Sequence, residues 1–253
     1  MNRAPLVRVW APVEEPASLN PAQGLPKPGF AASPGGVKAS DMKSCQCQGI
    51  ETKFNELEAA RKLADYRKNG PITTTRLLIA ALHAAGVTER TLLDIGGGVG
   101  AIPHALLKAG ASGAVSVDAS SAYVEAARQE TRRRGLSDQV TFHHGDFVEL
   151  ARDIAPVDIV TLDRVICCYD DMPALVALSA ERARRLYGLV YPLDAAWVRL
   201  GLRLMNLLWR LQGSPFRIFA HPTAAVEAIL LERGLRRSFY RRSGVWQVAV
   251  YAR

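Results

Sequence analysis

The sequence predicts an α/β protein in which helices cover both faces of a doubly wound, mainly parallel sheet. From residue 91 onward, short apolar runs alternate with helical patterns, which is typical of parallel strands joined by right-handed crossovers. Four of the apolar runs end at or shortly before an aspartate, at Asp94, Asp118, Asp146 and Asp163. Because ligands of such sheets bind outside the carboxyl ends of the strands, we expect these carboxylates to surround one ligand site.

The composition indicates one main globular domain with an appendage. The chain has 253 residues and is 49% hydrophobic, as is typical of a soluble folded domain. Its four cysteines form two close pairs and lack the spread of a secreted disulfide framework, so we expect a cytoplasmic protein. We find no apolar run of a length that spans a membrane and no signal-peptide pattern, and we expect neither secretion nor a membrane span.

The formal net charge of +8 comes mostly from arginines, which cluster at residues 132–134, 182–185 and 236–242. Nucleic-acid binding is one interpretation of these clusters, and solvated helix ends are the other. We prefer the second, because the clusters fall on predicted helix ends and on the predicted hairpin. An acidic small molecule or an anionic membrane surface remains compatible with the charge.

The residues before the sheet are predicted to form a tail followed by a helical segment. Residues 1–38 are rich in proline and lack an apolar period, which predicts a disordered tail. Within residues 39–88 we expect an amphipathic helix at residues 49–68 and a second helix at residues 74–85. An Asn-Gly-Pro run separates the two helices.

The first strand, at residues 91–95, runs into a glycine-rich turn and then into a helix at residues 99–109. Glycines without Cβ atoms let a ligand lie against the backbone, and the free N–H groups of the helix start point to the same place. A dinucleotide fingerprint can also be read from this turn. Asp94 argues against it, because a carboxylate below the turn would repel a pyrophosphate and attract a cationic ligand.

Six further strands complete a predicted seven-stranded sheet. These strands are expected at residues 114–118, 140–143, 157–162, 186–191, 235–241 and 245–251, with helices at residues 120–134, 147–152 and 172–184. The last two strands are joined by a short turn at Ser243 and Gly244, so they form an antiparallel hairpin. Residues 194–220 form an apolar helical insertion after the fifth strand, and residues 89–253 form the main domain.

The pattern Asp-x-Gly-x-Gly-x-Gly, formed by Asp94, Gly96, Gly98 and Gly100, resembles the first motif of the class I S-adenosylmethionine-dependent methyltransferases. That cofactor carries a sulfonium and an α-amino group and no phosphate, which suits a carboxylate under the loop. The resemblance implies the family's Rossmann-like sheet with an antiparallel C-terminal hairpin. Within the family it extends to the magnesium-protoporphyrin and ubiquinone-type enzymes, which share a long apolar insertion after the fifth strand.

The resemblance also implies roles for the residues at the other strand ends. In the family, an acidic residue at the place of Asp118 accepts hydrogen bonds from the ribose hydroxyls. A residue at the place of Asp146 accepts from the adenine amino group, and the backbone N–H and side chain of the next residue, here Phe147, hold the ring. Asp163 stands where the family lines the methyl-transfer pocket.

The helical segment at residues 39–88 corresponds to helices that, in the family, often cover the cofactor pocket as a lid. This resemblance would bring Tyr66 and Arg67 near the cofactor. The alternative is a packing helix whose Tyr66 covers the core.

Three residues are candidates for the chemistry itself. Methyl transfer is an in-line displacement at a carbon that the sulfonium activates, so an enzyme supplies mainly positioning and, for a poor nucleophile, a base. Asp163 could orient the acceptor or contact the amino acid part of the cofactor, and Tyr169 and His221 could act as acid or base. The structural alternative for these two is a half-buried tyrosine and a histidine that fixes the start of a helix.

The cysteines allow two interpretations. Cys45 and Cys47 precede the helical segment, and Cys167 and Cys168 follow the fourth strand, so four thiols could meet above the site and hold zinc or an iron–sulfur cluster. We prefer the alternative of buried and free thiols without a metal, because the spacings differ from the usual Cys-x2-Cys.

The helix expected at residues 194–212 has an unusually narrow polar face. This stripe consists of Arg199, Arg203, Asn206 and Arg210. The remaining apolar surface exceeds what one contact buries, so it needs cover from the sheet and the N-terminal helices, a partner subunit, a membrane surface or an apolar acceptor. An acceptor pocket would take its apolar wall from Trp197, Met205 and Trp209.

The expected function is transfer of a methyl group from S-adenosylmethionine to a small-molecule acceptor that is apolar or lipid-like. The sequence after Leu162 lacks the Asp/Asn-Pro-Pro-aromatic and Pro-Cys motifs of enzymes that methylate nucleic acids, which argues against that substrate. We expect a monomer or homodimer, with peripheral membrane contact through residues 194–212 as an option. An NAD-dependent oxidoreductase and a non-catalytic S-adenosylmethionine-binding regulatory protein are the alternatives.

Overall fold

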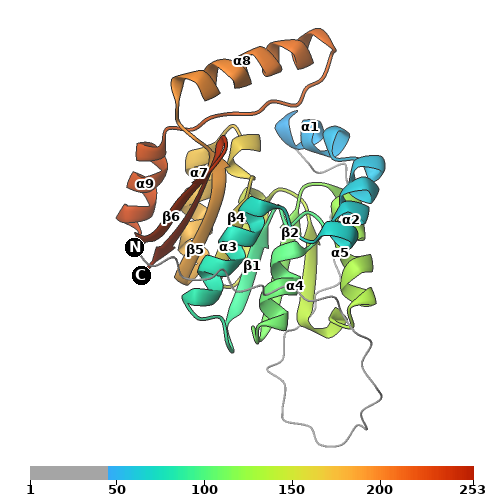
Figure 1. The fold of residues 1–253 in the computed structure, drawn as a ribbon, viewed down its shortest axis with the longest axis vertical. Coiled ribbons are helices and arrows are strands. Elements are labelled where there is room, and N and C mark those ends of the chain that lie inside the picture. Colours follow the sequence, from blue (N-terminus) through green and yellow to red (C-terminus); the bar gives the residue numbers. More distant parts are fainter. Residues whose placement is uncertain (1–44) are drawn as a thin grey trace, which may run out of the picture. The chain divides into compact units, whose positions relative to one another are not determined.

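The structure is a computed structural model, which describes residues 45–253 of the chain and their side chains from Gly49 onward. Its single seven-stranded sheet has the order β3-β2-β1-β4-β5-β7-β6 (Figure 1). The strands are β1 Thr91–Ile95, β2 Gly113–Asp118, β3 Val140–His144, β4 Val157–Asp163, β5 Ala183–Pro192, β6 Arg236–Ser243 and β7 Trp246–Ala252. Strands β1 to β5 are parallel, whereas β7 is antiparallel to β5 and β6. The predicted fold class is confirmed, including the hairpin.

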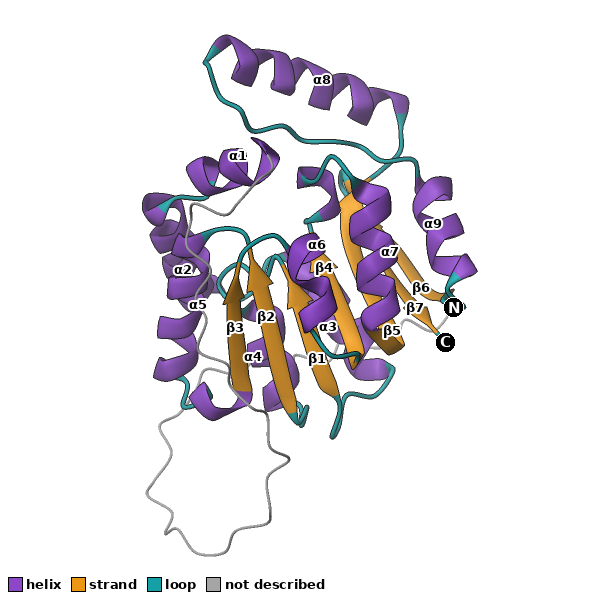
Figure 2. Cartoon of the chain, turned by 180° about the vertical axis from the view of Figure 1, so that it is seen from behind, coloured by secondary structure: helices purple, strands orange, loops and turns teal. Residues whose placement is uncertain are grey.

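Helices pack on both faces of the sheet because successive strand residues point to opposite sides. The helices are α1 Cys45–Lys53, α2 Glu56–Asn69, α3 Thr73–Ala84, α4 Ala101–Lys108, α5 Ser121–Arg133, α6 Phe147–Leu150, α7 Met172–Arg182, α8 Ala196–Leu211 and α9 Thr223–Glu232. In β1, Leu93 belongs to the core under α6, α7 and α9, whereas Leu92 belongs to the core under α3 and α4. Figure 2 shows these two layers around the sheet.

The N-terminal helical segment differs from the prediction at one point. The single helix expected at residues 49–68 is wrong, because the chain breaks between α1 and α2 at Asn55. The side-chain Oδ1 of Asn55 accepts a hydrogen bond from the N–H of Glu58 at 3.1 Å, which caps the start of α2. Asparagine is among the strongest N-cap residues, so this cap competes successfully with a continuous helix.

Several predictions concern parts of the chain that lie outside the described residues. They are the tail at residues 1–38, residues 39–44 of the predicted lid, and the side chains of Cys45 and Cys47.

Helix α8 lies beyond the carboxyl ends of the strands, apart from the layers that cover the sheet (Figure 2). Of its large apolar side chains, Val198 is buried, but Leu204 and Leu208 are 56% and 57% exposed. The alternative prediction that the sheet and the N-terminal helices cover α8 on both sides is therefore wrong for the side that carries Leu204 and Leu208. Across residues 45–253, no helix combines the length and apolar character needed to cross a bilayer.

Candidate functional site

The glycine loop between β1 and α4 depends on its glycines for reasons of backbone and of packing. The angle φ is +64° at Gly96 and +83° at Gly100, values that side chains rarely tolerate. A Cβ on Gly96 would meet the side chain of Val165, and a Cβ on Gly100 would lie 2.7 Å from Cε1 of His104. At Gly98 nothing lies closer than 3.8 Å. The space beside Gly98 is therefore open to a ligand. The corresponding space beside Gly96 is filled by Val165, and that beside Gly100 is filled by His104.

Asp94 lies under this loop, near the end of β1, and is 1% exposed. Its Oδ1 accepts a hydrogen bond from Oγ1 of Thr161 at 2.6 Å, whereas Oδ2 has no partner among the described residues. A Cβ on Gly97 would lie 2.9 Å from Oδ2, which places that oxygen directly against the loop. Burial raises the pKa of the Asp94 carboxyl to about 8. A buried oxygen without a donor favours a cationic or hydrogen-bonding ligand.

Asp118, at the end of β2, connects that strand to the glycine loop. Its Oδ2 accepts from the N–H of Gly98 at 3.0 Å, and its Oδ1 accepts from the N–H of Ser120 at 2.9 Å. Burial is the largest influence on this carboxyl and raises its pKa to about 6. Because each carboxylate oxygen has two lone pairs, Asp118 retains the capacity to accept from two further donors.

Asp146 caps α6 and holds a side chain from the loop after β4. Its Oδ1 accepts from the N–H of Val148 at 2.9 Å, and its Oδ2 accepts from the hydroxyl of Tyr169 at 2.7 Å. The side chain of Phe147 is 3% exposed and belongs to the core on the sheet. The ring of Phe147 thus packs in the core, and its predicted contact with a ligand stays a prediction.

Asp163 ends β4 and receives hydrogen bonds from two segments. The hydroxyl of Thr75, on α3, donates to Oδ2, and Nε of Arg164 donates to Oδ1 at 3.2 Å. Arg164 has a φ of +62°, and such a backbone costs a residue with a side chain about 1 kcal/mol or more. No pattern in the sequence singles out Thr75, Thr161 or Arg164, although all three lie at this edge. A non-glycine residue with a positive φ beside a half-buried carboxylate is typical of functional sites, so it adds to the case for this strand edge as the candidate site.

His221 lies in the strap, the name used here for residues 213–222, which connects α8 to α9. Its Nε2 lies 2.8 Å from the carbonyl oxygen of Ile166 and 3.1 Å from that of Tyr169. Since carbonyl oxygens only accept, Nε2 carries a proton and donates it to both. Burial lowers the pKa of His221, so the ring is neutral near pH 7 and Nδ1 has the lone pair. His221 thus fixes the loop that carries Tyr169.

The start of the N-terminal segment meets the strap beyond the strand ends. The ring of Phe216 is 5.5 Å from the ring of Phe54 and 5.3 Å from that of Trp209, measured between centroids. Phe216 itself is 3% exposed. The carboxylate of Glu51, on α1, accepts from the N–H of Ser121 at 2.9 Å, which ties α1 to the start of α5. Residues 49–54 and the strap therefore form one cover over this edge of the sheet.

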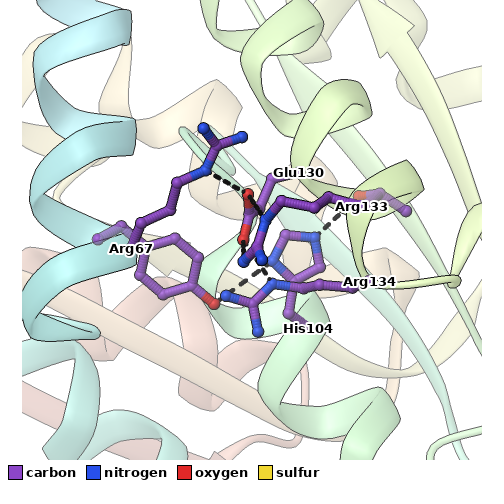
Figure 3. A network of polar contacts seen from close by, with 7 residues as sticks. Arg67, His104, Glu130, Arg133 and Arg134 are labelled. Carbon is purple, nitrogen blue, oxygen red and sulfur yellow. Dashed lines mark hydrogen bonds and ion pairs between the residues drawn. The ribbon is translucent and has the colours of Figure 1, made fainter. Parts of the chain in front are cut away.

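A polar network lies behind the glycine loop and centres on Glu130 of α5 (Figure 3). The side chain of Glu130 is fully buried, and its carboxylate receives three arginines. The nitrogen-to-oxygen distances are 2.8 Å to Arg67, 2.6 Å to Arg133 and 2.8 Å to Arg134. Because Arg67 comes from α2, this cluster joins the N-terminal segment to the main domain.

The same network holds the imidazole that packs against Gly100. Nε2 of His104 lies 2.8 Å from the hydroxyl of Thr131, and Nδ1 lies 3.4 Å from the hydroxyl of Tyr66 (Figure 3). Burial lowers the pKa of His104 to about 4, so the ring is neutral near pH 7. Tyr66 and Arg67 therefore make the contacts of the packing alternative, with α4 and α5 as their partners.

Two thiols, those of Cys167 and Cys168, lie next to the site in the loop after β4. Cys167 is buried and Cys168 is half-buried, and their sulfur atoms are 3.8 Å apart. In the part of the chain that the structure describes, no three His, Cys, Asp or Glu side chains are grouped so that they could hold a metal ion. Since the side chains of Cys45 and Cys47 lie outside that part, the four-thiol site stays a prediction.

Comparison with known proteins supports the interpretation of this edge. Residues 92–187 match the family model described as a methyltransferase domain. Among curated proteins, the chain is 32% identical over 74 residues to the ribosomal protein L11 methyltransferase of Escherichia coli O8. It is 29% identical over 123 residues to the enzyme of the same name from Alteromonas mediterranea. The matched segments cover 29% and 46% of this chain but only 25% and 42% of those relatives.

Solved structures share the fold over most of the chain. The magnesium protoporphyrin IX methyltransferase from Synechocystis PCC 6803, solved with bound SAH, superposes with a TM-score of 0.65 at 20% identity. That similarity covers 82% of this chain and 99% of the cyanobacterial one. An O-methyltransferase family protein from Burkholderia thailandensis gives a TM-score of 0.60 at 15% identity, covering 81% of this chain and 63% of that one. At such identities the similarity establishes the fold.

Proposed function

We propose that this chain transfers a methyl group from S-adenosylmethionine to a small acceptor. Its residues 92–187 match the family model of a methyltransferase domain, and its sheet has the fold of solved methyltransferases. The observation that carries the proposal is the buried, unpartnered Oδ2 of Asp94 against the glycine loop. A cationic cofactor fits this oxygen, whereas a pyrophosphate would face a carboxylate in a poorly hydrated place. An NAD-dependent oxidoreductase is therefore the less suitable alternative.

The chain's own residues would hold such a cofactor from three strand ends. Asp94 would neutralise a cationic group, and Asp118 would accept from hydroxyls with its remaining lone pairs. Asp146 and the backbone of Phe147 would hold the ring system, by resemblance to the family. When bound, S-adenosylmethionine supplies a methyl group on a sulfonium, which activates the carbon toward nucleophiles.

The residues after β4 would position the acceptor. Asp163 is held by Thr75 and by Arg164, so its orientation is fixed from two elements. The hydroxyl of Tyr169 donates to Asp146, which supports a positioning role for Tyr169 in this proposal. The fixed tautomer of His221 keeps the lone pair on Nδ1, the atom that could accept a proton from the acceptor.

We infer an apolar or lipid-like acceptor from the cover over the strand ends. The inner side of α8 presents Met205 and Trp209, both half-buried, and Trp209 packs on Phe216 of the strap. Apolar walls with a few polar groups are typical of small-molecule sites. A protein acceptor is the competing class, because the curated relatives are named for a ribosomal protein; the chain matches only a part of their length.

The experiment uses S-adenosylmethionine with a labelled methyl group and a panel of acceptors. We expect label in an organic extract after incubation with apolar carboxylic acids or quinone-like phenols. Label in precipitated ribosomal protein, with none in the extract, would replace the small acceptor by a protein. Cofactor binding without label in any arm would assign the protein to the regulatory alternative. Binding of NADH and not of S-adenosylmethionine would overturn the cofactor itself.

The variant Asp118→Ala is expected to bind S-adenosylmethionine more weakly by about 1.5–3 kcal/mol, the range for hydrogen bonds to a charged group. The loss has two sources, because Asp118 would contact the ligand and also holds the N–H of Gly98. Isothermal titration calorimetry measures it. Asp138→Ala, at an exposed aspartate outside the strand edge, is the control and should leave the affinity unchanged. Equal affinities for all three proteins would contradict the role of Asp118.

A further inference from the structure

Helix α8 has two apolar sides, and only one of them packs on the protein. The inner side consists of Val198, Leu202, Met205 and Trp209, which are buried or half-buried. The outer face, as named here, consists of Trp197, Leu200, Leu204, Leu207, Leu208 and Leu211. Each of these six side chains is between 52% and 76% exposed. Their spacing of three and four residues makes them one continuous stripe along the helix.

The inner contacts fix which way the outer face points. Asn206 bonds to the backbone of Ile218 in both directions, its Nδ2 donating at 2.7 Å and its Oδ1 accepting at 2.9 Å. Trp209 packs on Phe216, and Nζ of Lys53 lies 5.1 Å from the Trp209 ring. These contacts hold α8 to the strap and to α1, so the helix cannot turn its outer face inward without breaking them. The exposed stripe is a property of the folded domain.

The charges around the outer face are basic. Residues 194–221 contain four arginines and a single acidic residue, Asp194, which pairs with Arg199 at 2.5 Å. Arg203 and Arg210 are exposed and form no ion pair within the described part of the chain. Two copies of the protein joined through this face would bring these arginines together without acidic partners. An anionic partner with an apolar interior complements them better.

A second exposed feature lies at the same end of the molecule. The N–H of Leu193 donates to the carbonyl of Val245 at 2.8 Å, which places the turn of the β6–β7 hairpin beside the start of α8. Val245 is 39% exposed, and the neighbouring Arg241 and Arg242 are exposed as well. The hairpin turn therefore extends the combination of apolar and basic side chains beyond α8.

We propose that the outer face of α8, with the hairpin turn, docks on a membrane surface that contains anionic lipid. The helix would lie in the interface, with its leucines among the acyl chains and Arg203 and Arg210 at the headgroups. Docking in this way turns the carboxyl ends of the strands, and the candidate site, toward the membrane (Figure 1). This last step rests on the proposed function, since it gives an apolar acceptor a path that avoids water.

The test is co-sedimentation of the full chain with vesicles, in the absence of cofactor and acceptor. We expect binding to phosphatidylcholine vesicles that contain phosphatidylglycerol, and weaker binding to phosphatidylcholine alone or in high salt. The double variant Leu204→Gln/Leu208→Gln should lose roughly tenfold or more in affinity, because both side chains leave the apolar stripe. Leu57→Gln, at an 81% exposed leucine on α2, is the matched control and should bind as the original protein does.

Two further measurements separate the possible outcomes. A blue shift of tryptophan fluorescence with vesicles, reduced in Trp197→Phe, would place the outer face at the lipid. Sedimentation equal for the double variant and the original protein, or absent for both, would overturn the proposal. A dimer that Leu204→Gln/Leu208→Gln dissociates would assign the face to a second copy and overturn it too. Calorimetry with S-adenosylmethionine on the same variants tests the proposed function separately, because these leucines lie outside the candidate site.

Discussion

Replacing Glu130 with alanine is expected to lower the free energy of unfolding by about 2–4 kcal/mol, as does loss of one partner from a buried ion pair. The carboxylate is fully buried and is the common partner of Arg67, Arg133 and Arg134. Its removal leaves three positive charges facing one another. The arginines are themselves 20% to 53% exposed, so water can solvate them in part, which keeps the loss below that of a fully buried charge. Chemical denaturation at neutral pH measures the difference.

Glu125→Ala on the same helix is the matched control. Glu125 pairs with Arg132 at 3.1 Å, but both side chains are more than 60% exposed, so we expect a change of about 0.5 kcal/mol or less. Equal losses for the two variants would show that the buried cluster does not hold α2 to α5. A large loss from Glu125→Ala would contradict the distinction between buried and exposed pairs in this helix.

The difference in free energy of unfolding between the original protein and Glu130→Ala should depend on pH, because the pKa of Glu130 changes on folding. Burial alone would raise this pKa, but the hydrogen bonds from Arg133 and Arg67 and the charges of the arginines lower it to about 2, from 4.5. A carboxyl whose folded-state pKa lies below its unfolded-state value stabilises the fold above the unfolded value. That stability is lost as the pH falls from 4.5 toward 2. The original protein and Glu130→Ala should therefore become more similar in free energy of unfolding as the pH falls through this range.

The sheet could be predicted from the sequence because its strands are short apolar runs bounded by turns. Each strand from β1 to β5 is paired on the parallel pattern expected for alternating strands and helices. The break at Asn55 could not be predicted from periodicity. An asparagine fits on the polar side of an amphipathic helix as well as at an N-cap, and the tertiary contacts of Phe54 with Tyr123 and Phe216 add to the cap in favouring the break.

The candidate site was predictable where a residue belongs to a strand end, and less so where its partner comes from elsewhere in the chain. The four aspartates lie at neighbouring strand ends because parallel strands end at the same edge. Thr75 and Thr161 gave no signal, since a threonine in a helix or strand is unremarkable until it faces a carboxylate. His221 and Tyr169 were identified as polar residues near the edge, but their bonding to Ile166 and Asp146 required the folded chain.

The orientation of α8, which covers the site together with the strap, could likewise be predicted only in part. A helical wheel predicted that α8 has more apolar surface than one contact can bury, and the exposure of its outer face agrees. The wheel could not show that Trp209 faces the strap while Trp197 faces away, because both belong to apolar surface. That assignment depends on the contact of Trp209 with Phe216 of the strap, and Phe216 in turn contacts Phe54 of the N-terminal segment.

Asp94→Asn is expected to preserve or raise the stability of the unliganded protein but to lower its affinity for S-adenosylmethionine. In the protein alone, burial raises the pKa of Asp94 to about 8 from 3.8. A carboxyl with a raised folded-state pKa costs stability as the pH rises from the unfolded value toward the folded one. Asparagine has no charge to bury and can still accept from Thr161, so the variant should be at least as stable as the original protein at pH 7. Thermal unfolding without ligand tests this step.

The complex should lose affinity in the same variant. The Oδ2 atom of Asp94 has no partner among the described residues, and a cationic group of S-adenosylmethionine would be its partner when bound. We expect Asp94→Asn to weaken binding by about 3 kcal/mol, at the upper end for a hydrogen bond between charged groups in a buried place.

The pH dependence of binding gives an independent check on Asp94. In the original protein, a protonated Asp94 must release its proton to the solvent before it can face a cation. Affinity should therefore rise with pH up to about 8, and binding at pH 7 should release protons. Calorimetry in buffers of different ionisation enthalpy detects that release, and it should be absent in Asp94→Asn. Tight, pH-independent binding by the variant would show that the cofactor's charge is held elsewhere, and the assignment of Asp94 would fall.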